Sequence, residues 1–118
     1  DVATRHYREA LHLKPDWPPA LTGLSWILSS AVDSAMRQPD EAVRLATVAA
    51  NAARGTDPAA LDALAAAHAS AGQFEKAIAT ATTAAELARR AGALEFVGDI
   101  ERRIVLYRAR RGYVMGAR

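Results

Sequence analysis

One spacing of small residues recurs three times along the chain and constrains its fold more than any other feature. Each occurrence places three residues at steps of four and then three, and the occurrences start at positions 3, 42 and 77. The trios are Ala3, Tyr7, Ala10; Ala42, Ala46, Ala49; and Ala77, Ala81, Ala84. Such steps place each trio on one face of a helix. Offsets of 39 and 35 residues are typical of helical repeat proteins.

The composition favours helix nearly throughout. The 118 residues are 51% hydrophobic and 24% charged, which excludes disorder, and alanine dominates the apolar set. Strand-forming residues are sparse and do not alternate. We therefore expect an all-α fold. The predicted helices span 2–14, 17–30, 39–54, 58–71, 74–91 and 94–111.

Local residues mark where these helices begin and end. Asp16 is predicted to cap a helix that begins at Trp17, and Asp57 followed by Pro58 repeats this start signature. Single glycines stand where helices should stop, because glycine accepts the left-handed conformation there. These glycines are Gly55, Gly72 and Gly92.

A longer pattern surrounds the trios. The later unit contains Leu61, Leu64, Ala65, His68, Gly72, Phe74, Ala77, Ala81 and Ala84. The earlier unit contains Leu21, Leu24, Ser25, Leu28, Ala42, Ala46 and Ala49, and the chain opens with a second half alone, Ala3, Tyr7, Ala10 and Pro15. Over residues 1–91 this order resembles the tetratricopeptide repeat, about 34 residues that read W-x2-L-G-x2-Y, A-x3-F and then P. The resemblance implies a right-handed α-α superhelix (a TPR-like solenoid) of antiparallel helix hairpins.

The chain departs from the family pattern in three ways. Arg54 and Arg89 occupy the terminal proline position, and leucine or histidine replaces the aromatic residues of the first helix. The earlier unit carries five extra residues between its helices, which we expect to form a bulged or short 3₁₀ connection over 31–36. The expected organisation is a single TPR-like domain, 1–118, made of the second helix of a truncated repeat (1–16), a repeat with an extended inter-helix turn (17–56), a second repeat (57–91), a capping helix (92–111) and a tail (112–118).

The last predicted helix has one apolar stripe and one charged face. The stripe consists of Val97, Ile100, Ile104 and Tyr107. A solenoid needs an end unit that is polar outside, so this helix is predicted to be the C-terminal cap. We expect the tail to be poorly ordered, with Tyr113 as a residue that could pack back on the helices.

No set of residues predicts catalysis. His6 and His12 are six residues apart and so lie on different helix faces, and His68 is interpreted as a partly buried structural residue. The chain has no cysteine, no glycine-rich phosphate loop and no acid or histidine placed to activate Ser29. We therefore predict that the chain is not an enzyme and binds no metal or cofactor.

The resemblance implies a protein or peptide ligand on the concave face, which the first helices line. The corresponding positions are Thr22, Trp26, Ser29, Ser30, Asp62, Ala66 and Ala69. In the family, lysine, asparagine and arginine at such positions bind the C-terminal carboxylate of a peptide. None of these residue types occupies the seven positions here, so specificity for a C-terminal carboxylate is not predicted. Trp26 has the largest contact surface of the set. It could anchor a partner, or its ring could pack between neighbouring first helices.

Basic residues near the C-terminus support an alternative function. Seven arginines lie in the last third of the chain, Arg89, Arg90, Arg102, Arg103, Arg108, Arg110 and Arg111. Such a surface could bind nucleic acid or another anionic partner. Helical spacing predicts that Glu86 pairs with Arg90 and Asp99 with Arg103. This pairing favours a solvated capping face over a nucleic-acid site.

Other expectations concern the chain's surroundings. A start inside a helix indicates a fragment of a longer protein, and a docking or regulatory tail of a larger enzyme is a further alternative. The first predicted helix lacks a preceding neighbour, so its exposed face offers a surface for self-association through Ala3, Tyr7, Ala10 and Leu11. No apolar run reaches the length of a membrane span, and a cytoplasmic location is favoured without being fixed by the sequence.

Overall fold

The structure, a computed structural model, describes residues 2–115. These residues form α-helices and one short 3₁₀ helix and contain no strand, which confirms the all-α prediction. Every predicted helix is present, with ends that differ from the prediction by at most three residues. The elements are α1 (Val2–Leu13), α2 (Pro18–Ser30), η1 (Ser34–Met36), α3 (Pro39–Ala52), α4 (Pro58–Ser70), α5 (Phe74–Arg90) and α6 (Leu94–Arg108).

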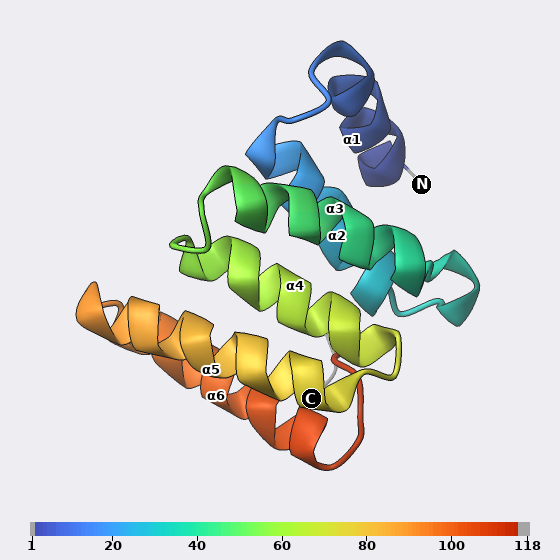
Figure 1. Ribbon diagram of the computed structural model, residues 1–118. Coiled ribbons are helices and arrows are strands. Elements are labelled where there is room, and N and C mark those ends of the chain that lie inside the picture. The colour runs from blue at the N-terminus through green and yellow to red at the C-terminus, as the bar shows by residue number, and fades with distance from the viewer. Residues whose placement is uncertain (1, 116–118) are drawn as a thin grey trace.

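The helices stack in chain order. Each α-helix packs on the next one along the chain, and α2 also packs directly on α4. Figure 1 shows α1 at one end of this stack and the pair α5 and α6 at the other. The direct packing of α2 on α4 brings together the two helices on which the binding face was predicted.

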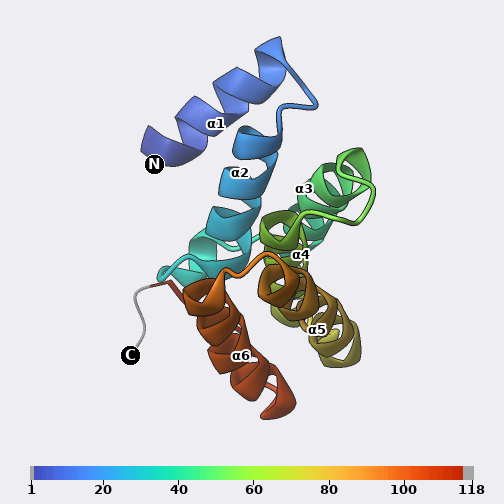
Figure 2. The ribbon, with the colours of Figure 1, turned by 90° about the vertical axis from the view of Figure 1, so that its left-hand side faces the viewer.

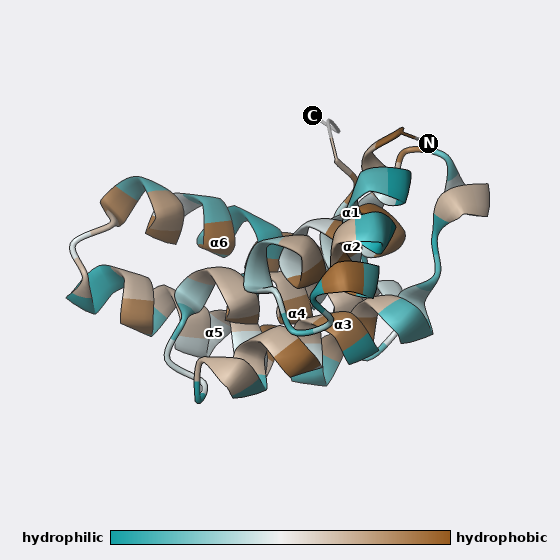
Figure 3. Ribbon diagram, turned by 90° about the horizontal axis from the view of Figure 1, so that it is seen from above, coloured by the Kyte–Doolittle hydropathy of each residue, from teal (hydrophilic) through white to brown (hydrophobic). Residues whose placement is uncertain are grey.

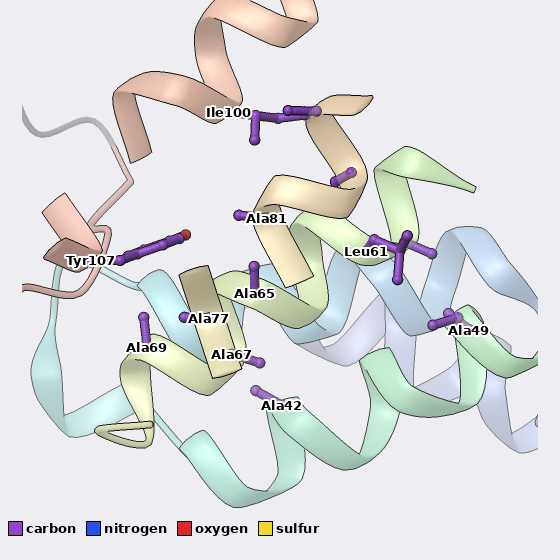
Figure 4. Close-up of a cluster of buried hydrophobic side chains, with 14 of the residues drawn as sticks. Ala42, Ala49, Leu61, Ala65, Ala67, Ala69, Ala77, Ala81, Ile100 and Tyr107 are labelled. Atoms are coloured by element: carbon purple, nitrogen blue, oxygen red, sulfur yellow. The ribbon is translucent and has the colours of Figure 1, made fainter. Parts of the chain in front are cut away.

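The two later alanine trios form the middle of the core. Ala42, Ala46, Ala77, Ala81 and Ala84 are completely buried. Figure 4 shows alanines of α3, α4 and α5 facing one another where these helices meet. Alanine side chains allow this because they are small enough for helix backbones to approach closely. The repeated spacing thus marks the faces along which neighbouring helices pack.

The first trio behaves differently. Ala3 is exposed, Tyr7 and Ala10 are half-buried, and α1 contains no buried residue. The Tyr7 ring reaches Gly23 of α2, where an added Cβ would lie 2.4 Å from Tyr7 Cζ. A glycine is therefore needed at position 23 for α1 to approach α2 in this way.

The predicted helix starts are partly right. Asp57 caps α4, since its Oδ1 accepts a hydrogen bond from the Ala59 N–H at 3.0 Å. The prediction for Asp16 is wrong: Trp17 is the N-cap of α2, and no side chain caps this end. Pro18 occupies the first turn of α2, so one N–H that would otherwise need a partner is absent there.

The helix ends and the insertion follow the predictions. Gly55, Gly72 and Gly92 have φ angles of +71°, +80° and +75°, the left-handed conformation expected after a helix. The extra residues between α2 and α3 contain the 3₁₀ helix η1. Arg37 holds this loop closed, because its Nε donates a hydrogen bond to the Ala31 carbonyl at 2.7 Å.

Helix α6 covers one side of the core. Its predicted stripe, Val97, Ile100, Ile104 and Tyr107, is buried. Figure 3 shows hydrophilic residues alternating with hydrophobic ones along this helix, as expected of a helix with one buried face.

The segment after α6 folds back instead of leaving the surface. The Met115 N–H donates a hydrogen bond to the Ser30 carbonyl at 2.8 Å, and Figure 2 shows this segment reaching the C-terminal end of α2. The prediction of a poorly ordered tail is therefore wrong for residues 112–115, and the contact of Met115 with Ser30 was not predicted. The packing of Tyr113 against the helices is confirmed. Residues 116–118 lie outside the described part of the chain.

Candidate functional site

The predicted binding residues lie on the two helices that pack on each other. Four of them belong to α2 and three to α4. Thr22 and Trp26 are half-buried. The others are buried, namely Ser29, Ser30, Asp62, Ala66 and Ala69. Arg103 of α6 and Met115 of the following segment lie against part of this surface, and whether the seven residues bind a partner stays a prediction.

Arg103 connects the covering helix to the predicted face. Its Nη2 and Nε lie 2.5 and 3.1 Å from the two carboxylate oxygens of Asp62. The Arg103 and Asp62 side chains are only 14% and 3% exposed. This is a two-point guanidinium–carboxylate pair, the geometry that suits arginine best. It joins α6 to α4 across 41 residues of sequence.

Aromatic rings enclose the same guanidinium. Arg103 Cζ lies 5.4 Å from the ring centroid of Trp26 and 5.3 Å from that of Tyr113. The two rings meet edge to face with their centroids 5.8 Å apart. Trp26 therefore packs against the chain's own arginine and tail. We call Trp26, Asp62, Arg103 and Tyr113 the Arg103 cluster.

Burial dominates the electrostatics around this cluster. Burial raises the pKa of the Asp62 carboxyl even though Arg103 lowers it, so removal from water outweighs the ion pair. Burial also raises the pKa of the nearby Tyr107 hydroxyl above its usual range. That hydroxyl has no hydrogen-bond partner within residues 2–115. Removal from water in the packed interior is thus the main cause of both pKa shifts.

The ion-pair partner predicted for Arg103 is wrong. Helical spacing predicted Asp99 four residues earlier, but Asp99 pairs with Arg102 instead. Asp62 was expected on the concave face, and no spacing in the sequence connects it with Arg103, 41 residues later. The predicted pair of Glu86 and Arg90 is not formed in the part of the chain that the structure describes.

Ion pairing reduces the basic surface near the C-terminus. Four of the seven arginines pair with carboxylates. The pairs are Arg89 with Glu101, Arg102 with Asp99, Arg103 with Asp62 and Arg110 with Glu75. A phosphate backbone would have to compete with these carboxylates for most of the cluster.

A cavity remains open beside the tail, on the predicted binding side. Its volume is about 630 Å³, and Ser29 and Ala69 of the predicted set line it. Its other lining residues are Ser34, Arg37, Pro39, Ser70, Gly72, Phe74, Arg111, Gly112, Tyr113 and Val114. This is the size of a small-ligand or side-chain pocket. The lining contains two arginines and no acidic residue.

A smaller cavity of about 320 Å³ lies where α1 meets α2 and α3. Leucines form much of its wall, and Arg8, His12 and Arg44 also line it. Arg8 Nη1 bonds to Glu41 Oε2 at 2.9 Å across this cavity's rim, which lowers the pKa of the Glu41 carboxyl. The pair ties α1 to α3 on an accessible surface.

The histidines do not gather. His68 is half-buried, and its Nδ1 lies 3.0 Å from Gln73 Oε1, which matches the structural role expected of it. No group of three potential metal ligands occurs within residues 2–115. Among the described helices, none combines the length and the hydropathy that crossing a bilayer requires.

Comparisons with known proteins add no assignment. Neither a protein-family model, nor a curated protein, nor a solved structure matches this chain.

Proposed function

We propose that this chain is a protein-interaction module that binds a peptide segment of a partner on the face formed by α2 and α4. One observation carries the proposal: this face already holds a segment without helix or strand structure, residues 111–115 of the chain itself. That segment uses a backbone hydrogen bond to Ser30 and an aromatic contact with Trp26. A surface that binds a non-helical segment through both kinds of contact is suited to a peptide of a partner.

The repeat pattern supports the same proposal. The helices follow one another as hairpins in the order expected of tetratricopeptide units, and the two full trios are buried between neighbouring helices. We propose a TPR-like right-handed superhelix, with α2 and α4 as the first helices of its repeats. In that arrangement Trp26 and the cavity beside it lie on the concave face.

Two alternatives have less support. Nucleic-acid binding through the C-terminal arginines competes with the ion pairs that four of them form. A docking role within a larger enzyme would use the same peptide-binding face, and it differs from the proposal only in placing this chain within an enzyme. The Arg103 cluster gives no reason to propose catalysis by this chain, since its acid is occupied by an arginine.

A peptide-display selection against the chain tests the proposal. Selected peptides are expected to bind the wild type and to bind Trp26→Ala at least about tenfold more weakly, since buried aromatic anchors often contribute more than 2 kcal/mol. The matched control is Val48→Ala, which removes a 40% exposed apolar side chain of α3. Circular dichroism verifies that both variants are folded.

Peptides that depend on Val48 and are indifferent to Trp26 would contradict the proposal. Nuclear magnetic resonance titration with a selected peptide locates the binding site. Amide shifts in residues 26–30 and 66–70 are the expected result, and shifts confined to α1 or α5 would contradict the proposal.

A further inference from the structure

The lining of the 630 Å³ cavity contains two arginines and no carboxylate. Arg37 comes from the loop between α2 and α3, and Arg111 comes from the segment after α6. Neither arginine forms an ion pair within residues 2–115. Both lie outside the repeated helices, so the resemblance to tetratricopeptide repeats gives no reason to expect them here.

The geometry holds one arginine in place and leaves the other adaptable. Arg37 Nε donates to the Ala31 carbonyl at 2.7 Å, and Nη2 lies 3.4 Å from the Val32 carbonyl. Beyond these bonds, Nη1 has no hydrogen-bond partner within residues 2–115. No side-chain hydrogen bond engages the exposed guanidinium of Arg111 in the described chain. Arginine binds planar and tetrahedral oxyanions through paired N–H groups.

Neutral donors line the same cavity. The hydroxyls of Ser34 and Ser70 take part in no hydrogen bond within the described residues. The hydroxyl of Ser29 is already engaged, with the Trp26 carbonyl at 3.4 Å and Ser30 Oγ at 2.9 Å. Two free hydroxyls and two guanidinium groups offer more donors than acceptors.

Apolar side chains form the remaining walls. Phe74, Tyr113 and Val114 contribute rings and a methyl-bearing surface. Such walls reduce the access of water and so strengthen an ionic contact beside them. They also leave room for more than a bare ion, since the volume falls within the range of cavities that hold organic ligands.

We infer that this cavity binds an acidic side chain of a partner peptide, a carboxylate or a phosphorylated hydroxyl, between Arg37 and Arg111. The inference rests on the proposed function, since it supplies the chemistry that a peptide on the α2–α4 face would present. Ser34 and Ser70 add hydrogen bonds to the same anion. The rest of the peptide continues along Trp26.

Nuclear magnetic resonance titrations of the whole chain test the inference. The probes are blocked hexaglutamate, a blocked peptide with one phosphoserine among glycines, inorganic phosphate and blocked hexalysine. One or both acidic peptides are expected to saturate a single site and to shift the amides of Arg37, Ser70 and Arg111. Hexalysine is expected to cause no such shift.

Two variants locate the site. Arg111→Gln is expected to weaken binding of the acidic peptide about tenfold or more, because it removes a charged donor. Ser70→Glu is expected to weaken it at least as much, since it places a negative charge in the cavity wall. The matched control is Arg108→Gln, which removes an exposed arginine of α6 that lines no part of this cavity and should leave affinity unchanged.

Three results would overturn the inference. Binding of inorganic phosphate without either acidic peptide would show a site for a free ion. Equal loss in Arg108→Gln and Arg111→Gln would show general attraction to a basic surface. Absence of acidic-peptide binding would also refute it, whereas peptides selected through Trp26 would still support the proposed function.

Discussion

The two ends of the helical stack are attached by different means. At one end, α1 buries no residue, rests a half-buried tyrosine on Gly23 and forms the accessible Arg8–Glu41 pair. At the other end, α6 buries an apolar stripe and joins α4 through the Asp62–Arg103 pair. The same repeat spacing is present in α1 and in α5, yet only α5 has its trio buried.

This difference shows that a repeat pattern defines a face without guaranteeing that the face is covered. Helix α5, which carries Ala77, Ala81 and Ala84, packs on both α4 and α6. Helix α1 has α2 alone as a substantial neighbour among the described elements. Apolar burial, and with it stability, therefore increases from α1 toward the other helices.

The largest expected effect breaks the C-terminal attachment. Asp62→Ala leaves Arg103 in a mostly buried position without its carboxylate, which should lower the free energy of unfolding by about 3–5 kcal/mol. Chemical denaturation measures this change. Asp99→Ala, which removes the exposed partner of Arg102, should cost about 1 kcal/mol or less. Equal costs would mean that burial does not distinguish the two pairs.

The next effect releases the N-terminal helix. Gly23→Ala places a methyl group 2.4 Å from Tyr7 Cζ, so the ring must move away and α1 should lose its docking, at about 1–3 kcal/mol. Hydrogen exchange is expected to accelerate in α1 and to stay unchanged in α6.

Gly98→Ala is the control for that substitution. Its new methyl group would lie 3.5 Å from the nearest atom, Arg102 Nη1, an ordinary contact. Alanine should stabilise α6 by about 0.5–1 kcal/mol, since glycine is unfavourable inside a helix. If hydrogen exchange in α1 is as slow in Gly23→Ala as in the wild type, the contact of Tyr7 with Gly23 does not hold α1 in place.

A smaller effect of opposite sign is expected inside the C-terminal end. Tyr107→Phe removes a buried hydroxyl that has no partner within residues 2–115, which should stabilise the fold by about 1 kcal/mol or leave it unchanged. Thermal denaturation of the two proteins measures the change. A loss above about 1 kcal/mol would show that the hydroxyl is hydrogen-bonded.

The smallest effect concerns how the free energy of unfolding changes with pH. The carboxyl groups at the two ends, Glu41 and Asp62, should change it in opposite directions on acidification. The folded pKa of Glu41 is lowered by Arg8, so its contribution to stability is present above its unfolded pKa and is lost as the pH falls. The folded pKa of Asp62 is raised, so its contribution is present at low pH and is lost as the pH rises through that value.

Unfolding free energies measured between pH 3 and 6 separate these contributions. Glu41→Gln should reduce the loss of stability on acidification by about 1 kcal/mol or less, because the pair is accessible to water. Asp62→Asn should increase that loss. The same slope in both variants would mean that the two carboxyls have similar folded pKa values.

The sequence by itself determined the helices and the faces by which they pack. Alanine spacing, the Asp57–Pro58 start and the stopping glycines act within a few residues, so their consequences can be predicted without knowledge of distant segments. For the same reason the insertion at 31–36 and the buried stripe of α6 were predictable.

Only the tertiary structure decided what covers the α2–α4 face. The Asp62–Arg103 pair, the contact of Trp26 with Tyr113 and the meeting of Arg37 with Arg111 at one cavity join residues far apart in sequence. No periodicity encodes such contacts, because they depend on how the chain returns after α6. Helical spacing therefore predicted a pair of Arg103 with Asp99. In the folded chain Arg103 instead binds the buried carboxylate of Asp62 and packs against the rings of Trp26 and Tyr113.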